Sequence, residues 1–396
     1  MRPFDGRRIW LVGIGGAGLS AYGILAHAWG AEVGGWDRNE TPYLGPVRAA
    51  GIEVRVSPEP EARAGYETYV SSAYPGATGR PRADLLAELV SLRPSIVVAG
   101  AHGKTTTTAM IAFGMRETGR DPSWIVGAEV PQLGANAGAG EGWLVVEGDE
   151  SDRSVASLRP QIAVLTNVDL DHHATFASRA EVEDLFEGWL ERVPNVVRGW
   201  ELQPIEAELV VPGQHNRRNA AAALAALEAA GVGREEAATA LARFEGVARR
   251  FQRMGEAGEV GVYDDYAHNP AKVAAALATA RERTRGRVLA VFQPHLYSRT
   301  RHPAEELAQA LGAADVVAVT AVYAAREQPI DGVTGKLVVD ALARNHPGTV
   351  LGWMPELEDG ARFVVRRARP GDVVLTLGAG DVDRAAPLIL EALERP

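Results

Sequence analysis

The sequence predicts an α/β protein with three domains in series. At roughly 100–200 residues per domain, a chain of 396 residues is expected to hold two to four. Short runs of β-branched and apolar residues alternate with helical stretches, and this alternation favours parallel sheets covered by helices. It breaks at Pro94 and at the Pro-Gly pair 212–213. We therefore expect domains at 1–94, 95–212 and 213–396.

The composition excludes several classes of protein. The formal net charge of −10 disfavours nonspecific attraction to nucleic acid or to an anionic membrane surface. The absence of cysteine removes disulfides, thiolate metal sites and cysteine nucleophiles. No uninterrupted apolar run approaches the roughly 20 residues that span a bilayer. We expect a cytoplasmic monomer or homodimer that acts on small molecules, with neither nucleic acid nor a membrane as partner.

The first domain opens with a strand at 8–14, a glycine-rich turn and a helix at 19–30. The turn has the spacing G-x-G-x-x-G, and an acidic residue ends the next strand about 20 positions on, as in dinucleotide-binding turns. Such glycines let the backbone approach a diphosphate at a helix N-terminus. The pattern also fits a tight turn without a ligand, and it does not distinguish NAD from another diphosphate nucleotide. Its residues are Gly13, Gly15, Gly16, Gly18 and Asp37.

The second domain opens with a strand that runs into "GAHGKTTTT" at 100–108. This loop matches only the second half of the usual phosphate-binding pattern, because Val98 stands where the first glycine is expected. Four consecutive threonines begin the following helix, and Lys104 is one of three lysines in the chain. Lys104 could reach the phosphates of a nucleotide, and Thr105 could ligate Mg²⁺. We interpret the loop as a phosphate site rather than a surface turn.

Acidic residues and histidines follow the next two strands of this domain, at 143–149 and 161–169. The first strand ends in "EGDESD" and the second in "TNVDLDHH". Ligands of α/β sheets lie at the carboxyl ends of the strands. Carboxylates there could hold Mg²⁺ beside a phosphate loop. Each residue alone fits a helix cap or a solvated turn equally well.

The last third alternates again, with strands at 261–266, 287–294, 315–323 and 372–380. An Ala-rich helix precedes it, after "PGQHNRRN". Arginine, aspartate and histidine gather in "RRFQRMGE", "YDDYAHNP" and "FQPHLYSRTR". These clusters favour a site for anionic ligands over scattered surface charges.

Together these stretches resemble the Mur ligase family, the ATP-dependent amide-forming enzymes of peptidoglycan synthesis, and most closely its alanine-adding branch. The resemblance covers nearly the whole chain and runs in order through "GIGGAGLSA", "SSAYPG", "GAHGKTTTT", "EGDESD", "TNVDLDHH", "PGQHNRRNA", "RRF", "DDYAHNP", "FQPHLYSRTR" and "GAGDV". The family's loop is the compact form G-[TA]-x-G-K-T, so Val98 does not break its pattern.

The resemblance implies a Rossmann-like domain for the UDP substrate, a P-loop ATPase-like central domain and a Rossmann-like C-terminal domain. It implies ATP-binding residues Gly100, His102, Gly103, Lys104, Thr105, Thr106, Asn216, Asn219, Arg250 and Asp265. The implied Mg²⁺ ligands are Thr105, Glu147 and His172. The implied catalytic residues are Lys104, Glu147, His172, Arg250 and Asp265. The UDP substrate would meet Gly13, Gly15, Gly16, Gly18, Asp37, Ser71 and Ser72, and the acceptor side would have His268, His295 and Arg299.

The implied reaction joins L-alanine to UDP-N-acetylmuramate through an acyl phosphate made from ATP. Two departures from the family's pattern stand out. The family's aspartate-tyrosine-glycine-histidine-histidine run is Asp-Tyr-Ala-His-Asn at 265–269, which leaves the acceptor open. The central domain is also short between His173 and Pro212, where the family carries a longer segment. Three alternatives remain: a peptide-adding ligase of the same family, a nicotinamide-dependent oxidoreductase, and a non-catalytic nucleotide-binding homologue.

Overall fold

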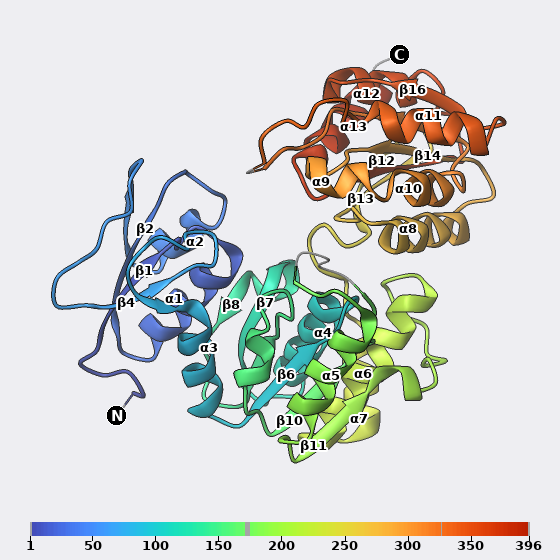
Figure 1. Cartoon of the computed structure of the whole chain (residues 1–396). Coiled ribbons are helices and arrows are strands. Elements are labelled where there is room, and N and C mark those ends of the chain that lie inside the picture. The colour runs from blue at the N-terminus through green and yellow to red at the C-terminus, as the bar shows by residue number, and fades with distance from the viewer. Residues whose placement is uncertain (1, 171–174, 326, 395–396) are drawn as a thin grey trace. The chain divides into compact units, whose positions relative to one another are not determined.

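Short apolar strands build separate sheets in this chain, and helices pack on them (Figure 1). The computed structural model describes residues 2–170, 175–325 and 327–394. Within these residues the strands form three sheets with mostly parallel pairing, which confirms the expected α/β class. The chain divides into two compact units, the first ending at Ala248 and the second beginning at Arg249.

The first sheet is parallel and has the strand order β3-β2-β1-β4-β5. Successive side chains of a strand point to opposite faces, so its apolar residues divide between two layers. One face packs against helices that carry buried leucines at helical spacing. The elements are β1 (Arg8–Val12), α1 (Ala17–Ala28), β2 (Glu32–Asp37), α2 (Leu44–Ala49), β3 (Glu53–Val56), β4 (Glu67–Val70), β5 (Arg80–Pro81) and α3 (Arg82–Ser91).

An aromatic layer lies on the other face of this sheet. Trp10 and Trp36 are fully buried there. The indole nitrogen of Trp10 donates to the Glu61 carbonyl at 2.6 Å, and that of Trp36 donates to Ser57 Oγ at 2.7 Å. Buried indole N–H groups need such partners. The segment near residues 57–61 therefore helps to cover this face of the sheet, as helices cover the opposite face.

The second sheet has the order β11-β10-β6-β9-β7-β8, and β8 runs antiparallel to β7. Strands β6, β9 and β10 read as continuous apolar runs because both of their faces are covered. Helices α4, α6 and α7 pack on one face and α5 on the other. The elements are β6 (Ser95–Ala99), α4 (Lys104–Glu117), β7 (Ser123–Val130), η1 (Pro131–Leu133), β8 (Ala135–Gly138), β9 (Leu144–Glu147), η2 (Ser154–Ser157), β10 (Ile162–Leu165), α5 (Arg179–Leu190), β11 (Asn195–Arg198), η3 (Gly199–Glu201), α6 (Gln214–Ala229) and α7 (Arg234–Ala242).

Helices α6 and α7 follow the Pro-Gly break at 212–213 where we expected the central domain to end. Their apolar residues, among them Leu224 and Leu241, share one core with α4 and β6. The first compact unit accordingly continues to Ala248. A Pro-Gly pair indicates a chain break, but it does not tell which core the next helix joins.

The third sheet lies in the second unit and has the order β12-β13-β17-β14-β15-β16, with β12 antiparallel. Helices α8, α10 and α11 pack on one face, and α12 and α13 on the other, in the arrangement typical of doubly wound sheets. The elements are β12 (Gln252–Ala257), β13 (Val260–Asp265), α8 (Pro270–Arg283), β14 (Val288–Phe292), α9 (Tyr297–Arg301), α10 (Ala304–Leu311), β15 (Val316–Val319), α11 (Lys336–Asn345), β16 (Val350–Trp353), α12 (Leu357–Val365), β17 (Val373–Leu377), η4 (Val382–Arg384) and α13 (Ala385–Glu394).

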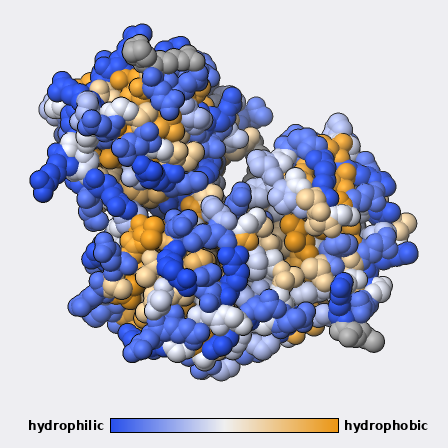
Figure 2. Space-filling view, turned by 180° about the vertical axis from the view of Figure 1, so that it is seen from behind, coloured by the Kyte–Doolittle hydropathy of each residue, from blue (hydrophilic) through white to orange (hydrophobic). Residues whose placement is uncertain are grey.

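Figure 2 shows hydrophilic residues over much of one face, with apolar residues in separate patches. Among the described helices, none combines the length and apolar character needed to cross a membrane.

Candidate active site

The loop between β6 and α4 needs glycine at two positions. Gly100 has φ +126° and Gly103 has φ +81°, a region that side chains other than glycine rarely adopt. A Cβ on Gly103 would lie 2.3 Å from Asn219 Oδ1, and one on Gly100 would lie 2.3 Å from Thr166 Oγ1. Val98 lies inside the buried strand β6, before the loop begins. The loop is therefore the compact form that the sequence indicated, and it needs no glycine at that position.

Helix α4 begins at this loop without a capping side chain. Gly103 is its N-cap, and α1 likewise begins after Gly16 with no side-chain cap. Ser178 caps α5 and Asn269 caps α8 through side-chain oxygens, whereas most of the other described helices also begin without a side-chain cap. Backbone N–H groups at an uncapped helix N-terminus, together with the helix dipole, favour anions. The two glycine-rich loops of the first unit thus share a feature that suits phosphate groups.

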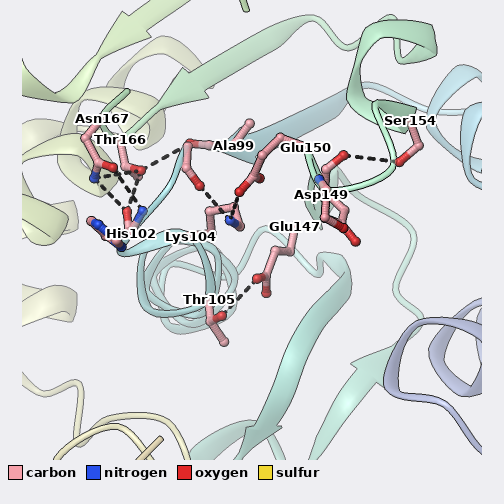
Figure 3. Close-up of polar contacts among 12 residues, drawn as sticks. Ala99, His102, Lys104, Thr105, Glu147, Asp149, Glu150, Ser154, Thr166 and Asn167 are labelled. Carbon is pink, nitrogen blue, oxygen red and sulfur yellow. Dashed lines mark hydrogen bonds and ion pairs between the residues drawn. The ribbon is translucent and has the colours of Figure 1, made fainter. Parts of the chain in front are cut away.

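The end of β10 holds the backbone of the phosphate loop in place. Asn167 Oδ1 accepts a hydrogen bond from the His102 N–H at 2.9 Å, and Asn167 Nδ2 donates to the His102 carbonyl at 2.8 Å. Thr166 Oγ1 donates to the same carbonyl at 2.6 Å (Figure 3). His102 therefore contributes its backbone to the loop. Thr166 was not predicted as a site residue, since a threonine after an apolar strand carries no specific signal.

Lys104 turns its side chain back over the loop. Its ammonium donates to the Gly100 carbonyl at 2.6 Å and to Glu150 Oε1 at 2.8 Å (Figure 3). Glu150 is 2% exposed, so this ion pair is sheltered from water. The structure thus places the one lysine of the central domain at the mouth of a glycine loop, as expected for a phosphate-binding lysine.

Thr105 and Glu147 lie together beside this lysine. Thr105 Oγ1 donates to Glu147 Oε1 at 2.9 Å, and Glu147 Oε2 accepts from the Gly127 N–H at 2.7 Å. A hydroxyl and a carboxylate at the end of a strand are hard oxygen donors of the kind that Mg²⁺ takes alongside substrate phosphates. The described residues hold no group of three or more His, Asp or Glu side chains that could bind a metal. The third expected ligand, His172, lies outside the described residues.

Asn216 and Asn219 come to the same loop from the first two turns of α6. Both are buried, at 5% and 8% exposure. Asn219 Nδ2 donates to Asn216 Oδ1 at 3.3 Å, and Asn216 Nδ2 donates to the Pro212 carbonyl at 2.7 Å. With Asn219 Oδ1 beside Gly103, the structure brings this expected pair to the phosphate loop. Thr106 is buried in the first turn of α4.

The glycine turn of the first sheet is organised by Asp37. Asp37 Oδ2 accepts from the Gly15 N–H at 2.8 Å, and Asp37 Oδ1 accepts from the Tyr74 hydroxyl at 3.0 Å. Thr41 Oγ1 donates to the Gly15 carbonyl at 2.8 Å. The acidic residue expected about 20 positions after the glycines therefore fixes the turn itself.

Ser71 and Ser72 follow β4, the strand beside this turn. The Ser71 N–H donates to the Val12 carbonyl at 2.9 Å. A Cβ on Gly13 would lie 2.7 Å from the Ser71 Cβ, so glycine is required for the close approach. Ser72 is exposed at the next position. The structure brings Ser71 to the glycines, while Ser72 faces solvent.

In the second unit, Arg250 and Asp265 lie near each other. Asp265 accepts hydrogen bonds from the Phe251 N–H at 2.7 Å and the Ala267 N–H at 2.8 Å. Burial raises the pKa of Asp265 to about 6, although the Arg250 guanidinium opposes the shift. The Arg250 guanidinium also lies 5.2 Å from the centre of the Tyr266 ring. These contacts bring the expected arginine and aspartate together at the carboxyl end of β13.

The preceding arginine, Arg249, makes structural contacts that the sequence did not reveal. Its Nε lies 3.1 Å from the buried carboxylate of Asp264. Its terminal nitrogens donate to the carbonyls of Gly380 at 2.8 Å and Gly378 at 2.9 Å. Arg249 therefore joins the start of the second unit to the loop after β17. Two adjacent arginines in a sequence give no sign of which one is bound internally.

His268, His295 and Arg299 form one cluster. His268 Nδ1 donates to the Tyr266 carbonyl at 2.9 Å, which leaves Nε2 to face Arg299 Nη1 at 3.4 Å. The rings of His268 and His295 lie 5.8 Å apart. Burial, with the charge of Arg299 adding to it, lowers the pKa of His295 to about 4. All three expected acceptor residues are thus brought together.

Two buried polar atoms, one in this cluster and one two residues before His295, have no hydrogen-bond partner among the described residues. They are His295 Nδ1 and Gln293 Oε1. Gln293 Nε2 donates to Asp381 Oδ1 at 2.9 Å, which orients the amide. Buried acceptors without donors are costly unless a ligand supplies the donor. Gln293 was not predicted as a site residue, because a glutamine after a strand carries no specific signal.

The histidine cluster predicts a dependence of stability on pH. Burial, with the charge of Lys272 adding to it, lowers the pKa of His268 to about 3, whereas an unfolded histidine titrates near 6.5. Protons then bind the unfolded chain first, so stability present above pH 6.5 is lost as pH falls towards 3. When the pH is lowered from 7.5 to 5, the free energy of unfolding of the parent falls partly because of His268. Glutamine does not titrate, so we expect this fall to be about 2 kcal/mol smaller in His268→Gln than in the parent. Urea unfolding at both pH values, followed in the second unit, measures this difference; equal losses would contradict it.

Comparisons with known proteins identify the family. Residues 98–197 match the model described as Mur ligase middle domain, and residues 249–380 match Mur ligase, glutamate ligase domain. A UDP-N-acetylmuramate–L-alanine ligase of Renibacterium salmoninarum is 38% identical over 98% of this chain and 96% of its own. The chain belongs to the Mur ligase family.

Two further Mur ligases extend this comparison. A UDP-N-acetylmuramate–L-alanine ligase of Rubrobacter xylanophilus is 37% identical over 98% of this chain and 100% of its own. The crystal structure of the UDP-N-acetylmuramate–alanine ligase MurC from Thermotoga maritima has a TM-score of 0.82 at 25% identity, with 97% of this chain and 98% of that chain covered. The expected resemblance and the three-domain Mur ligase fold are thereby confirmed.

This Mur ligase is shorter than the relatives it matches. The two alignments extend over 454 and 446 positions, compared with 396 residues in the chain. The relatives therefore carry segments that this chain lacks. Loss of such a segment between His173 and Pro212 stays a prediction, as do the domain boundaries at 94 and 212.

Proposed function

We propose that this Mur ligase joins L-alanine to UDP-N-acetylmuramate, with ATP converted to ADP and phosphate, in the synthesis of peptidoglycan precursors. The observation that carries the ligase chemistry is the glycine loop with the Lys104 ammonium over it and the Thr105–Glu147 pair beside it. The choice of substrates rests on the near full-length likeness to ligases of that name. A cytoplasmic location belongs to the same proposal, because ATP and Mg²⁺ are abundant there.

The nucleotide site would be built from the first unit. The uncapped first turn of α4 and the ammonium of Lys104 would hold the phosphates of ATP. Asn216 and Asn219 support the same loop from α6. Thr105, Glu147 and His172 would hold Mg²⁺, which when bound neutralises phosphate charge and orients the transferred group. Arg250 and Asp265, which the family resemblance implies as ATP-binding residues, remain predictions of the same proposal.

The reaction would proceed in two transfers. The muramate carboxylate attacks the γ-phosphorus of ATP, the bond to the bridging oxygen breaks, and ADP leaves an acyl phosphate behind. The amine of L-alanine then attacks the acyl carbon, the bond to phosphate breaks, and the amine loses a proton as the amide forms. Lys104 would offset the charge that builds on the phosphoryl oxygens. Because an acyl phosphate hydrolyses in water, the site must also exclude solvent during transfer.

The amino acid would bind at the histidine cluster of the second unit. Arg299 would pair with its carboxylate. His295 Nδ1 and Gln293 Oε1, both without donors among the described residues, could accept hydrogen bonds from its amine. His268 and His295 are neutral at pH 7, because their pKa values are lowered to about 3 and about 4. A neutral imidazole nitrogen such as His295 Nδ1 can accept a hydrogen bond from the amine, whereas an imidazolium ion would repel an ammonium group.

The departure at Asn269 has a local structural reason. Its side chain accepts a hydrogen bond from the Lys272 N–H at 2.9 Å, and Pro270 occupies the first position of α8. Asparagine before proline is a strong helix-start signal. The asparagine at this position therefore serves helix α8, and the acceptor does not have to differ from L-alanine because of it.

Phosphate release from ATP tests the proposed function. The assay contains Mg²⁺ and UDP-N-acetylmuramate, and each amino acid or the peptide of the recycling ligases is added in turn. We expect release that depends on L-alanine. Release with a peptide alone would keep the ligase chemistry and replace the acceptor. A folded protein that binds ATP and turns over no acceptor would favour the non-catalytic homologue.

A further inference from the structure

Arg82 joins the two nucleotide-binding loops of the first unit. It is the first residue of α3 and its side chain is 18% exposed. Its Nη2 donates to Asp149 Oδ2 and to Asp152 Oδ2, each at 2.8 Å, and its Nε donates to Asp152 Oδ2 at 3.3 Å. One edge of the guanidinium is therefore fixed to the segment that follows β9.

The other edge of the guanidinium faces the glycine turn of the first sheet. A Cβ on Gly18 would lie 2.9 Å from Arg82 Nη1, so glycine at this position leaves the room that the arginine occupies. Gly18 is in the first turn of α1, which has neither a capping side chain nor an acidic residue. Asp149 and Asp152 offset the charge of the guanidinium from the other side, so its contribution at this uncapped helix N-terminus is the Nη1 edge, whose N–H groups face the glycine turn. Such N–H groups, beside the positive end of the helix dipole, can donate to the oxygens of a diphosphate.

The buried hydroxyl of Tyr22, on α1, lies close enough to Arg82, Asp149 and Asp152 to interact with their charges. Burial raises the pKa of Tyr22 to about 12, and the carboxylates of Asp149 and Asp152 add to the rise while Arg82 opposes it. Asn136 Nδ2, on β8, donates to the carbonyl of Ala17 at 3.3 Å. Helix α1 thus begins against the second sheet, next to the segment that carries the ATP-site carboxylates.

The segment 147–152 serves both loops with alternate side chains. Glu147 meets Thr105 and Glu150 meets Lys104, both at the ATP loop. Asp149 and Asp152, between and after them, meet Arg82. Figure 3 shows Asp149, Glu147 and Glu150 on one short stretch of chain. A shift of this segment would therefore change the contacts of Lys104 and Thr105 at one loop and those of Arg82 beside the other.

We propose that Arg82 is a bridging residue: its Nη1 edge binds the diphosphate of the UDP substrate while its other edge holds Asp149 and Asp152, so that the UDP site and the ATP site are energetically coupled. This inference rests on the proposed function for the identity of the substrate. Coupling between two sites is reciprocal, so each nucleotide raises the affinity for the other. Arg82 is thus both a substrate-binding residue and a positioning residue for the 147–152 segment.

The test is a pair of titrations on the full-length protein. UDP and UDP-N-acetylmuramate are titrated into the parent, Arg82→Met and Arg82→Lys, and a non-hydrolysable ATP analogue is titrated with and without saturating UDP. Loss of a charge-assisted contact is expected to weaken UDP binding about 10- to 100-fold in Arg82→Met. In the parent, saturating UDP is expected to tighten the analogue about fivefold or more. This tightening is expected to disappear in Arg82→Met, and Arg82→Lys is expected to keep part of the UDP affinity.

A neighbouring arginine supplies the matched control. Arg80 begins β5, is exposed, and pairs with Asp84 at 3.1 Å and with the Tyr69 hydroxyl at 3.1 Å. Arg80→Met is expected to bind UDP and the ATP analogue as the parent does. If Arg82→Met is unstable, Arg82→Met/Asp152→Asn removes one of the carboxylates left unpaired and repeats the titration.

The outcomes separate this inference from the proposed function. Unchanged UDP affinity in folded Arg82→Met would overturn the inference even if the parent ligates L-alanine. Weakened UDP affinity with the coupling to the ATP analogue intact would also overturn it, since the bridge would then be absent. A parent that binds UDP but ligates no acceptor would defeat the proposed function, while the titrations would still decide the role of Arg82.

Discussion

Replacing Lys104 with methionine is expected to lower ATP-dependent phosphate release at least about 1000-fold, because a preorganised cation at a transferring phosphoryl group is worth that much or more. The structure places its ammonium 2.6 Å from the Gly100 carbonyl, over the glycine loop. Methionine keeps the aliphatic stem and removes the charge. Phosphate release with UDP-N-acetylmuramate and L-alanine, measured at saturating ATP, checks the loss.

The same change is expected to cost stability, and this must be separated from the catalytic effect. Glu150 is 2% exposed and would lose the Lys104 ammonium that now lies 2.8 Å away. Removing one partner of a buried ion pair costs about 3–5 kcal/mol. The double variant Lys104→Met/Glu150→Gln removes the stranded charge, so it is expected to recover stability without recovering turnover.

Lys336→Met is the matched control. Lys336 pairs with Asp340 at 2.6 Å on an exposed face of α11, and such surface pairs contribute about 0–1 kcal/mol. It is expected to leave turnover and unfolding free energy nearly unchanged. If Lys104→Met/Glu150→Gln were folded and active within about tenfold of the parent, the phosphate role of Lys104 would be wrong.

The glycine loop at 100–105 was readable from the sequence because its signals are local. Gly103, Lys104 and Thr105 are consecutive, they follow a continuous apolar strand, and parallel strands place their carboxyl ends at one edge. The same rule brought Glu147 to Thr105 across 42 positions of sequence. Buried strands with two covered faces are also long apolar runs, so the centres of all the sheets were predicted.

The parts that escaped prediction depend on contacts between distant segments. Arg82 contacts Asp149, which is 67 positions away in the sequence, and Arg249 contacts the Gly380 carbonyl, which is 131 positions away. Many other arginines of the chain have similar neighbours in the sequence, so nothing local singles these two out. Strands β5, β7, β8, β11, β12 and β16 were also missed, and all of them except β7 lie at the edge of their sheets. An edge strand is covered less completely, so its sequence carries a weaker apolar run.

Glu147→Gln is expected to raise the Mg²⁺ concentration needed for half-maximal turnover at least about tenfold and to lower turnover about 100-fold, because Mg²⁺ prefers carboxylate to amide oxygens. The glutamine can still accept from Thr105, whose hydroxyl now lies 2.9 Å from Glu147 Oε1. With the amide flipped, its oxygen can accept from the Gly127 N–H, at present 2.7 Å from Glu147 Oε2, while its NH2 group donates to the Thr105 hydroxyl. The fold should therefore survive with a modest loss of stability.

A readout independent of turnover decides whether Glu147 holds the metal. Binding of Mn²⁺ with ATP, followed by electron paramagnetic resonance, is expected to weaken by a similar factor of about ten. Glu141→Gln serves as the control, since Glu141 is 90% exposed and pairs with Arg93 away from the loop. Loss of turnover in Glu147→Gln with unchanged Mn²⁺ affinity would remove Glu147 from the metal site. Its carboxylate would then act through Thr105 and Gly127, as a support for the loop that carries Lys104.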